Sequence, residues 1–479
     1  MNLTVLFFII HAVIASISII HALLYKKDPR SALGWIAVCF AYPIIGPLLY
    51  YFFGINRVKT RAYKLTGKRR HYWFDYEGPN INFNPEVCLD DKSPAIDFGL
   101  VRSSAAVTHR KLTNNNNIVS YFSGDHAYQA MLKSVATANK TICLSSYIFD
   151  TSKLGKLFIN ALADAQNRGV NVYVIIDGIG ELYSYPRAKK LLKKMGLNTV
   201  SFIPPKLFPP SFYINLRNHK KLLIIDETIA FTGGMNISDR HLCITEKDKP
   251  GIQDMHFKLE GEIVSQLQDV FDEDWLYSTK KQRTNRSIQL PTNKEAGKSR
   301  CRVITDGPNE DIDKLISVIL SAVAVARKRV VIMSPYFLPP QSLLNALQTA
   351  ALRGVEVIII LPHRSNLFFI DWATKNILWE LLQYGVKVYF QPPPFNHSKL
   401  LLVDNDYAQI GSANIDPRSL RLNFELTVEI YDYVFVAELS RHVKSILQVS
   451  TPAALEELDD RPLLSRIKDA LAWLFSPYL

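Results

Sequence analysis

The sequence predicts a duplicated α/β domain that follows two membrane-spanning helices, and three observations support this fold class. The phrase NHKKLLIID at 218–226 returns as NHSKLLLVD at 396–404. The stretches before the two phrases also match one another in the same order. The first 54 residues contain two long stretches without a charged side chain.

The N-terminal stretches, 3–24 and 31–54, are each long enough to cross a bilayer as a helix. A cleaved signal peptide is the alternative for the first stretch. That stretch lacks a preceding basic segment, however, and it is longer than the apolar part of a signal peptide. We therefore expect a transmembrane hairpin over residues 1–56.

Basic residues near these stretches predict the orientation of the hairpin. The run INRVKTRAYKLTGKRR at 55–70 carries seven Lys or Arg, whereas the connecting loop KKDPR at 26–30 carries three. Basic residues accumulate on the cytoplasmic side of membrane proteins. The remainder of the chain is therefore predicted to lie in the cytoplasm.

The repeat extends well beyond the nine-residue phrase. ANKTICLSSYIFD (138–150) is matched by ARKRVVIMSPYFLP (326–339), and ALADAQNRGVNVYVIID (161–177) is matched by ALQTAALRGVEVIIILP (346–362). Within each half, β-branched runs alternate with amphipathic stretches, which is typical of α/β layering around a buried sheet. The predicted domains are the hairpin, a basic juxtamembrane connector at 57–110, a first domain at 111–290 and a second at 291–479. Their boundary falls in the polar stretch 278–300.

Composition narrows the possible partners and excludes some classes of site. The chain has 479 residues, 48% of them hydrophobic, which is enough for two or three domains with cores of their own. A net charge of +12 favours anionic partners, either nucleic acid or acidic phospholipid. The five cysteines include no CxxC pair, so neither a disulfide framework nor a zinc site is indicated.

Each nine-residue phrase contains the pattern HxKxxxxD. The first copy supplies His219, Lys221 and Asp226, and the second supplies His397, Lys399 and Asp404. In a strand, alternate side chains point to opposite faces, so the histidine and lysine share a face that the aspartate does not. Asp226 and Asp404 belong to the catalytic motifs, but we interpret them mainly as structural anchors where each strand ends.

An asparagine follows each histidine by seventeen residues. Asn236 comes after a Gly-Gly turn and Asn414 after a Gly-Ser turn that contains Ser412. An imidazole, an ammonium and an amide, each present twice, suit a phosphodiester: lysine and asparagine bind the phosphate oxygens, one histidine attacks phosphorus, and the other handles the proton. No carboxylate cluster or GxxxxGK[ST] loop accompanies the motifs, so we expect neither a metal nor a cofactor.

Each histidine also requires a group that fixes its tautomer. Asp254 and Glu425 stand in the apolar stretch that follows each motif, and they are the candidates for this orienting role. His256, two positions after Asp254, is a competing candidate. A single HxKxxxxD pattern is weak, but two copies with equivalent asparagines inside a repeat are unlike a chance match.

These residues resemble the two HKD motifs of the phospholipase D superfamily, and the resemblance extends from about residue 115 to the C-terminus. Within this superfamily the chain is most similar to bacterial cardiolipin synthases. The similarity includes the two N-terminal stretches, YPIIGPLLYYFFG, SPYFLP and GSANIDPRSLRLNFEL. The fold that it implies is two α/β/α sandwiches related by pseudo-twofold symmetry, with the active site at their interface.

The resemblance also implies a reaction and a location. Two phosphatidylglycerol molecules become cardiolipin and glycerol through a phosphatidyl-histidine, with His219 as nucleophile and His397 as acid and base. Asn236, Asn414 and Ser412 would bind the substrate, in the inner membrane of a bacterium and without nucleic acid. Gly234 departs from the family pattern because serine is common there, as at Ser412. The departure would cost a phosphate hydrogen bond and would make the two halves unequal.

Three alternatives remain at this point. A hydrolytic phospholipase D would share every catalytic residue, and a nuclease of the superfamily would suit the net charge. A membrane scaffold without catalytic activity would not need two complete motifs.

Two stretches bear on lipid access. PPKLFPPSFYINLRN at 204–218 suits either the membrane surface or ordinary loop packing, whereas Ile467, Leu471 and Leu474 on the last helix favour core packing over membrane docking.

Overall fold

The computed structural model describes residues 3–26, 28–42, 44–54, 98–205, 216–244, 250–283, 297–308 and 313–476. The chain divides into two compact units, Met1–Trp73 and Phe74–Leu479. Most of the predicted connector 57–110, most of the proline-rich stretch 204–218 and much of the predicted domain boundary at 278–300 lie outside the described residues.

The N-terminal unit contains one helix that could cross a membrane. This helix, α1 (Leu3–Tyr25), is apolar all round, and in the described part of the chain only its segment Val5–Tyr25 is both long and apolar enough for a span. The second predicted stretch forms three shorter pieces: α2 (Pro29–Ala41), α3 (Ile45–Leu49) and the π-helix η1 (Tyr50–Gly54). A continuous second helix over 31–54 is therefore not present.

Local chemistry accounts for the break in the second stretch. Asp28 caps α2 by accepting hydrogen bonds from the backbone N–H groups of Arg30 and Ser31, at 3.3 and 2.9 Å. The sequence has a proline at position 43, which ends a helix because it lacks an amide donor, and Ile44 has a positive φ of 62°. The Tyr50 hydroxyl lies 2.7 Å from His21 Nδ1 and connects η1 to α1.

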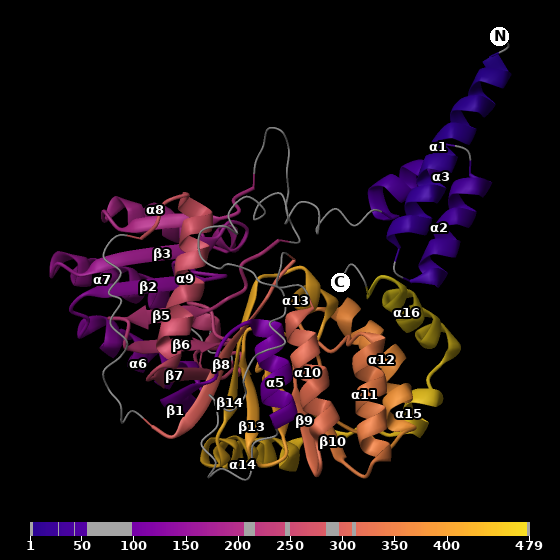
Figure 1. Cartoon of the computed structure of the whole chain (residues 1–479). Helices are drawn as coiled ribbons and strands as arrows, with labels where there is room; N and C mark the ends of the chain where they lie inside the picture. The colour runs from indigo at the N-terminus through magenta and orange to yellow at the C-terminus, as the bar shows by residue number, and fades with distance from the viewer. Residues whose placement is uncertain are drawn as a thin grey trace. The chain divides into compact units, whose positions relative to one another are not determined.

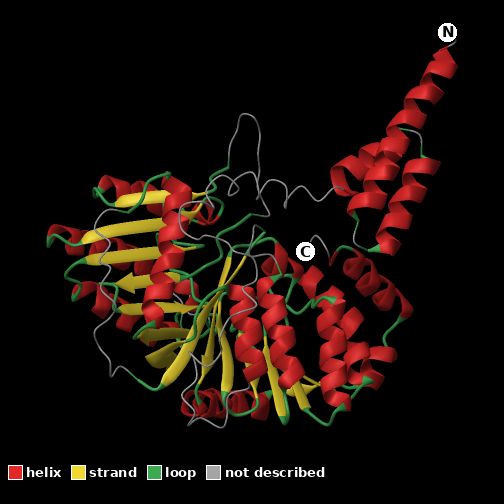
Figure 2. Cartoon of the chain, viewed as in Figure 1, coloured by secondary structure: helices red, strands yellow, loops and turns green. Residues whose placement is uncertain are grey.

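The second unit is an α/β structure built on one mixed sheet (Figures 1 and 2). The strands of its first half are β1 (Thr113–Tyr121), β2 (Thr141–Ser146), β3 (Asn171–Asp177), β4 (Asn198–Phe202), β5 (Leu222–Ile225), β6 (Ile229–Gly233) and β7 (His256–Glu260). Those of its second half are β8 (Ser299–Asp306), β9 (Arg329–Met333), β10 (Glu356–Pro362), β11 (Lys387–Gln391), β12 (Leu400–Val403), β13 (Tyr407–Gly411), β14 (Glu425–Tyr431) and β15 (Thr451–Pro452).

The order of the strands repeats between the two halves. The sheet runs β15-β11-β10-β9-β12-β13-β14-β8-β1-β7-β6-β5-β2-β3-β4, and β1 pairs with β8 at its centre. Counted outward from this pair, β7, β6, β5, β2, β3 and β4 correspond to β14, β13, β12, β9, β10 and β11. The duplication read from the sequence is therefore a duplication of structure.

Helices cover both faces of the sheet. In the first half, α6 (Gly124–Ala136), α7 (Lys153–Asn167) and α8 (Ala188–Lys194) pack on one face, and α9 (Ile263–Thr279) packs on the other. In the second half, α10 (Lys314–Val325), α11 (Gln341–Leu352) and α12 (Phe368–Leu382) correspond to the first set, and α14 (Tyr433–Val449) corresponds to α9. Shorter elements are η4 (Gly180–Tyr183), η5 (Asp239–His241), α13 (Pro417–Arg421) and α15 (Leu455–Asp459).

Two helices differ from the sequence-based interpretation. The sequence predicted no element in the connector, yet α5 (Phe98–Thr108) buries Leu100 and Val101 in the core of the second half. The last helix, α16 (Leu463–Leu474), was expected to bury Ile467, Leu471 and Leu474, but these side chains are 46, 54 and 62% exposed. The core-packing interpretation of these three residues is wrong, because α16 lies at the surface and contacts α12 with its opposite face.

Candidate active site

Each HxKxxxxD motif spans the start of a short strand. Strand β5 begins at Leu222 and β12 at Leu400, so the histidine and lysine precede the strand and the aspartate follows it. The prediction of one continuous strand was therefore too long. The residues before each strand pair instead with the other half of the protein.

Backbone hydrogen bonds join each motif to the other half. The N–H of His219 donates to the Phe424 carbonyl at 2.9 Å, and the N–H of His397 donates to the Gln253 carbonyl at 2.7 Å. Phe424 immediately precedes Glu425, and Gln253 immediately precedes Asp254. The two bridges therefore place each histidine beside a carboxylate from the opposite repeat.

The side chains complete this crossed arrangement. His219 Nδ1 lies 3.1 Å from the Glu425 carboxylate, and His397 Nδ1 lies 2.9 Å from Asp254 Oδ2. The sequence identified both carboxylates without assigning each to a histidine. An Nδ1–H that donates to a carboxylate leaves Nε2 free for the reacting group. His256, the competing candidate, does not hold either histidine.

Glu425 is fixed by polar neighbours. Ser412 Oγ donates to Glu425 Oε2 at 2.5 Å, and Asn423 Nδ2 donates to Oε1 at 3.2 Å. Burial alone would raise the pKa of Glu425, but the charge and hydrogen bond of His219, together with Lys221 and Ser412, lower it. Ser412, which was predicted to bind substrate, is fully buried and orients the carboxylate.

Asp254 has a different environment. Burial raises its pKa, in opposition to the lowering effects of Lys399 and His241. Gly234 stands where the second half has Ser412, and a Cβ there would lie 2.2 Å from Asp254 Oδ1. The close approach of the carboxylate leaves no room for a side chain at this position, so the two halves are unequal here.

A third histidine, which the sequence analysis missed, lies beside Asp254. His241 Nδ1 is 3.9 Å from Asp254 Oδ2, and its ring centroid is 6.2 Å from that of His397. Burial lowers the pKa of His241 to about 3, so the ring is neutral. Alignment of the two repeats would have shown the signal, since the equivalent position holds Ser419.

The two lysines are buried beside the histidines. Lys221 Nζ donates to the His219 carbonyl at 2.6 Å, and Lys399 Nζ donates to the His397 carbonyl while lying 2.8 Å from His397 Nδ1. Burial lowers the pKa of Lys221 to about 7 and that of Lys399 to about 8. An anion between them would restore their full charge.

The histidines share this electropositive environment. Burial lowers the pKa of His219, and Glu425 opposes the shift. Burial lowers the pKa of His397 further, with added effects from Lys399 and Lys221. Both shifts favour the neutral imidazole, and a bound phosphate would oppose the lowering effect of the lysines.

Other polar groups of the two motifs have separate positions. Asn236 Oδ1 accepts from the Ile148 amide at 3.1 Å, and both asparagines are buried, with 7% of Asn236 and 4% of Asn414 exposed. Tyr147 and Tyr336, which the sequence analysis did not select, flank the site: their rings lie 5.1 Å from His219 and 6.2 Å from His397. Both tyrosines lie in the repeated stretches SSYIF and SPYFL, which was an available signal.

The motif aspartates lie away from the histidines. Asp226 accepts hydrogen bonds from the amides of residues 139–141 at 2.7 to 2.9 Å. Asp404 accepts equivalent bonds from the amides of residues 327–329. Both have positive φ angles, 52° and 51°, at the turn after the strand. This geometry suits an anchor and gives neither carboxylate contact with a reacting atom.

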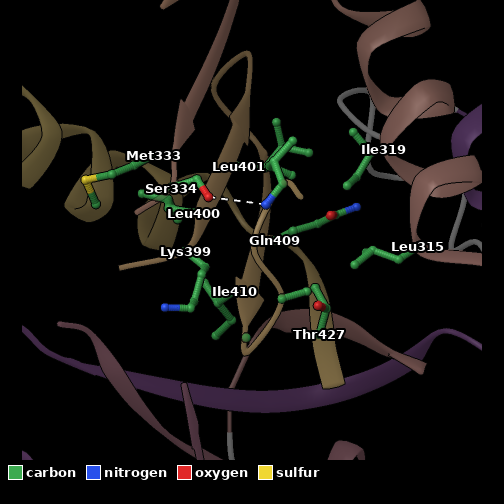
Figure 3. A pocket seen from close by; sticks show the side chains of 13 residues that line it. Leu315, Ile319, Met333, Ser334, Lys399, Leu400, Leu401, Gln409, Ile410 and Thr427 are labelled. Carbon is green, nitrogen blue, oxygen red and sulfur yellow. Dashed lines mark hydrogen bonds between the residues drawn. The ribbon is translucent and has the colours of Figure 1, made fainter. Parts of the chain in front are cut away.

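Two cavities lie close to the motifs. One of about 30 Å³ lies under the second motif and is lined by Leu315, Gln409 and Thr427 (Figure 3), which is too small for a lipid headgroup. The other, about 240 Å³, lies behind Asp254 and is lined mainly by polar residues such as Gln391 and Asn396. In the described ranges, no three His, Cys, Asp or Glu side chains are grouped to hold a metal ion.

Comparison with known proteins agrees with this geometry. The family described as "Cardiolipin synthase, PLD-like domain" matches residues 131–275 and 319–447, and "Phospholipase_D-nuclease N-terminal" matches residues 12–54. The chain is 31% identical to the major cardiolipin synthase ClsA of Bacillus subtilis (strain 168), over 99% of this chain and 98% of that protein. It is 29% identical to cardiolipin synthase 1 of Bacillus anthracis, over 95% and 90%.

A solved structure supports the fold. A phosphatidylserine synthase from Haemophilus influenzae Rd KW20 matches with a TM-score of 0.62 at 16% identity, over 79% of this chain and all of that one. At this identity the match indicates the architecture alone. The sequence relatives cover nearly the whole chain, and the family match covers both motif-bearing halves. The chain therefore belongs to the bacterial cardiolipin synthase family, whose members carry phospholipase D-like domains.

Proposed function

We propose that the protein is a membrane phosphatidyltransferase that converts two phosphatidylglycerol molecules into cardiolipin and glycerol. One observation carries this proposal: the crossed contacts bring both histidines, both lysines and two orienting carboxylates into a single site. Such a site matches a phosphodiester that is exchanged for another phosphodiester. Membership of the cardiolipin synthase family supports the choice of lipid.

The first half-reaction forms a covalent intermediate. Nε2 of His219 attacks the phosphorus of one phosphatidylglycerol, and the bond between phosphorus and the glycerol oxygen breaks. His397 supplies a proton from Nε2 to that oxygen, so that glycerol leaves neutral. The ionised Glu425 stabilises the positive charge that develops on His219, and the lysines neutralise the phosphate oxygens.

The second half-reaction reverses these roles. His397 removes the proton from the free hydroxyl of a second phosphatidylglycerol, and the resulting oxygen attacks phosphorus and displaces His219. The anionic substrate offsets the lysine charges that lower the pKa of His397, and so helps this residue to carry a proton. Asn236 and Asn414 are proposed donors to the phosphate in both steps.

We also propose that the N-terminal part of the chain forms a two-helix hairpin in the membrane. The second apolar stretch, although built from shorter helices, returns the chain to the side from which it started. The seven basic residues after it put the catalytic domains in the cytoplasm, beneath the inner membrane of a bacterium. Protease added outside spheroplasts should leave the catalytic domains intact.

The proposed division of the chain follows from the same features. Residues 1–56 form the hairpin, 57–110 connect it, and 111–290 and 291–479 form the two phospholipase D-like domains. Matching strand orders and crossed contacts support pseudo-twofold symmetry with the site on the axis.

Product analysis tests the function. The purified full chain is reconstituted in phosphatidylglycerol vesicles, and the lipids are identified by mass spectrometry. Cardiolipin and glycerol in equal amounts are expected. Phosphatidic acid as the main product would show the hydrolytic phospholipase D instead, and an absence of any lipid product would contradict both assignments.

A further inference from the structure

Exposed apolar side chains surround the approach to the two catalytic histidines. The loop after β3 exposes Leu182, Tyr183 and Tyr185 by 47, 52 and 96%. The equivalent region after β10 exposes Leu367, Phe368 and Phe369 by 46, 56 and 51%. We call these six residues the apolar rim. Single exposed apolar side chains are common, but clusters of large ones mark a surface that contacts another molecule or a membrane.

Contacts connect the apolar rim to the catalytic site. In the first half, the ring of Tyr183 lies 6.2 Å from that of Tyr147, which faces His219. In the second half, the Tyr336 hydroxyl bonds Asn366 Oδ1 at 2.6 Å, and the Tyr336 ring faces His397. Asn366 directly precedes the rim residue Leu367. The rim therefore borders the site from both repeats.

Helix α16 extends the second side of this surface. Lys468 Nζ stacks over the Trp372 ring at 4.5 Å, and that ring lies 5.0 Å from Phe368 and 5.3 Å from Phe369. Beside Lys468, the helix exposes the four apolar residues Leu464, Ile467, Leu471 and Leu474 by 81, 46, 54 and 62%. These four residues form the α16 face, and Lys468 on the same helix links α16 to the rim through Trp372.

Basic side chains accompany the apolar ones. Arg187 follows the first rim loop, Arg364 precedes the second, and Lys375, Arg466 and Lys468 lie on α12 and α16; all five are exposed. Apolar residues that insert at an interface, next to cations that attract anionic headgroups, are the composition of a membrane-surface element. The same cations oppose the approach of a second copy of this face.

We propose that the apolar rim and the α16 face form a docking surface for an anionic phospholipid bilayer. Docking places the opening of the site at headgroup depth, where a phosphodiester can reach the histidines while its acyl chains stay in the membrane. The surface explains why α16 leaves its apolar side uncovered. The choice of a lipid bilayer rests on the proposed function, but the contact itself is measurable without turnover.

Membrane contact is tested with a fluorophore on the full chain reconstituted in vesicles. Leu471→Cys is labelled with an environment-sensitive dye, in a background where Cys88 and Cys243 are serine. Leu352→Cys is the matched control, because Leu352 is 70% exposed at the end of α11, just before β10 begins, whereas the site lies beyond the opposite ends of β9 and β10. Nitroxide-bearing lipids in phosphatidylglycerol-containing vesicles should quench the dye at position 471 and leave position 352 unaffected.

Kinetics provide the second test. The double variant Leu471→Glu with Leu474→Glu should need about ten times more long-chain phosphatidylglycerol in the vesicle surface to reach its half-maximal rate. Its kcat should be unchanged. Activity on monomeric dibutyryl phosphatidylglycerol should stay within about twofold, and Leu352→Glu should change neither activity. Equal losses on both substrates would overturn the proposal.

Two further outcomes are informative: one would identify a different occupant of the surface, and the other would separate the docking proposal from the proposed reaction. Absence of quenching at position 471, with energy transfer between labelled copies, would replace the bilayer by a second copy of the chain. Quenching without cardiolipin formation by the unmodified protein would sustain the docking surface and reject the proposed reaction.

Discussion

Replacement of Glu425 by glutamine should abolish the function of His219, although the two residues belong to different repeats. Glutamine has nearly the same shape, and its single carbonyl oxygen can still accept the hydrogen bond from Ser412, whereas its NH2 group cannot accept the one from Asn423. The substitution therefore removes the charge and leaves the packing intact. If Glu425 stabilises the cation that forms on His219, the variant should fail before any covalent intermediate appears.

The magnitude follows from the short contact. Two unit charges 3.1 Å apart interact by about 5 kcal/mol at an effective dielectric constant of 20. At 1.36 kcal/mol per tenfold change in rate, this corresponds to roughly 10⁴-fold in the first half-reaction. Loss of the carboxylate that orients the histidine of a serine hydrolase has a similar effect, about 10⁴-fold.

The assay uses two substrates and a matched variant. Asp254→Asn removes the charge beside His397, which is 2.9 Å away. With phosphatidylglycerol both variants should be slow, since both half-reactions are needed. With a phosphatidyl nitrophenol, whose leaving group needs no proton, Asp254→Asn should still accumulate a phosphatidyl-histidine. Peptide mass spectrometry should locate that adduct on His219, and Glu425→Gln should form none.

Three results would refute this reasoning. An adduct on His397 in the Glu425→Gln variant would exchange the roles of the two histidines. Equal behaviour of the two variants would show that the crossed carboxylates do not act on separate histidines. A large fall in melting temperature for either variant would attribute its loss of activity to folding.

Further predictions concern the lysines, the motif aspartates and metal dependence. Since Lys221 and Lys399 must be ammonium ions to bind phosphate, kcat/KM should fall as pH rises through about 7 to 8. The value of kcat should fall only at higher pH, because bound phosphate raises the pKa values of both lysines. Asp226→Ala removes three hydrogen bonds to a carboxylate and should destabilise the fold by about 2 kcal/mol or more, seen as a lower melting temperature with little change in kcat of the folded protein. Gly234→Ser should reduce activity at least about tenfold because its Cβ displaces Asp254, while the melting temperature reports any wider damage. Excess chelator should leave the synthase rate unchanged, and recovery of a lost rate by one divalent ion would contradict a site that relies on lysines.

The sequence was sufficient for the duplication, the α/β class and both motifs. These properties are encoded locally, by hydrophobic period and by polar residues at fixed spacing, and the repeat shows each pattern twice. The position of Asp226 at the strand end followed from the period of two, and its amide contacts agree with that interpretation.

Other features depended on contacts that no local pattern encodes. The partner of His219 could not be chosen because Glu425 is 206 residues away and the halves pair only after folding. The helical break near Ile44 was missed because the prediction used the length and mean hydropathy of the whole stretch 31–54, and a single proline changes neither. The exposure of Leu471 was predicted wrongly because an amphipathic period shows that a helix has an apolar face without showing what covers it.

A duplicated site begins with two equivalent histidines, but the reaction requires them to differ. The structure supplies the difference through the carboxylates. His219, Lys221 and Ser412 lower the pKa of Glu425 against the effect of burial, which suits a histidine that must become cationic when it attacks phosphorus. Asp254, whose pKa is raised by burial, has glycine in place of that serine and a neutral histidine nearby, which suits a partner that gains and loses a proton.

The crossed contacts also couple substitutions in one half to the chemistry of the other half. If each histidine used the carboxylate of its own repeat, the two halves could evolve separately and each would keep a matched pair. Because the pairs cross, a substitution that adapts Asp254 alters the chemistry of His397 in the other repeat. Exchanging the carboxylates, by Asp254→Glu together with Glu425→Asp, should therefore impair both half-reactions more than conservative size changes alone would suggest. Adduct formation and glycerol release, measured separately, would reveal the two effects.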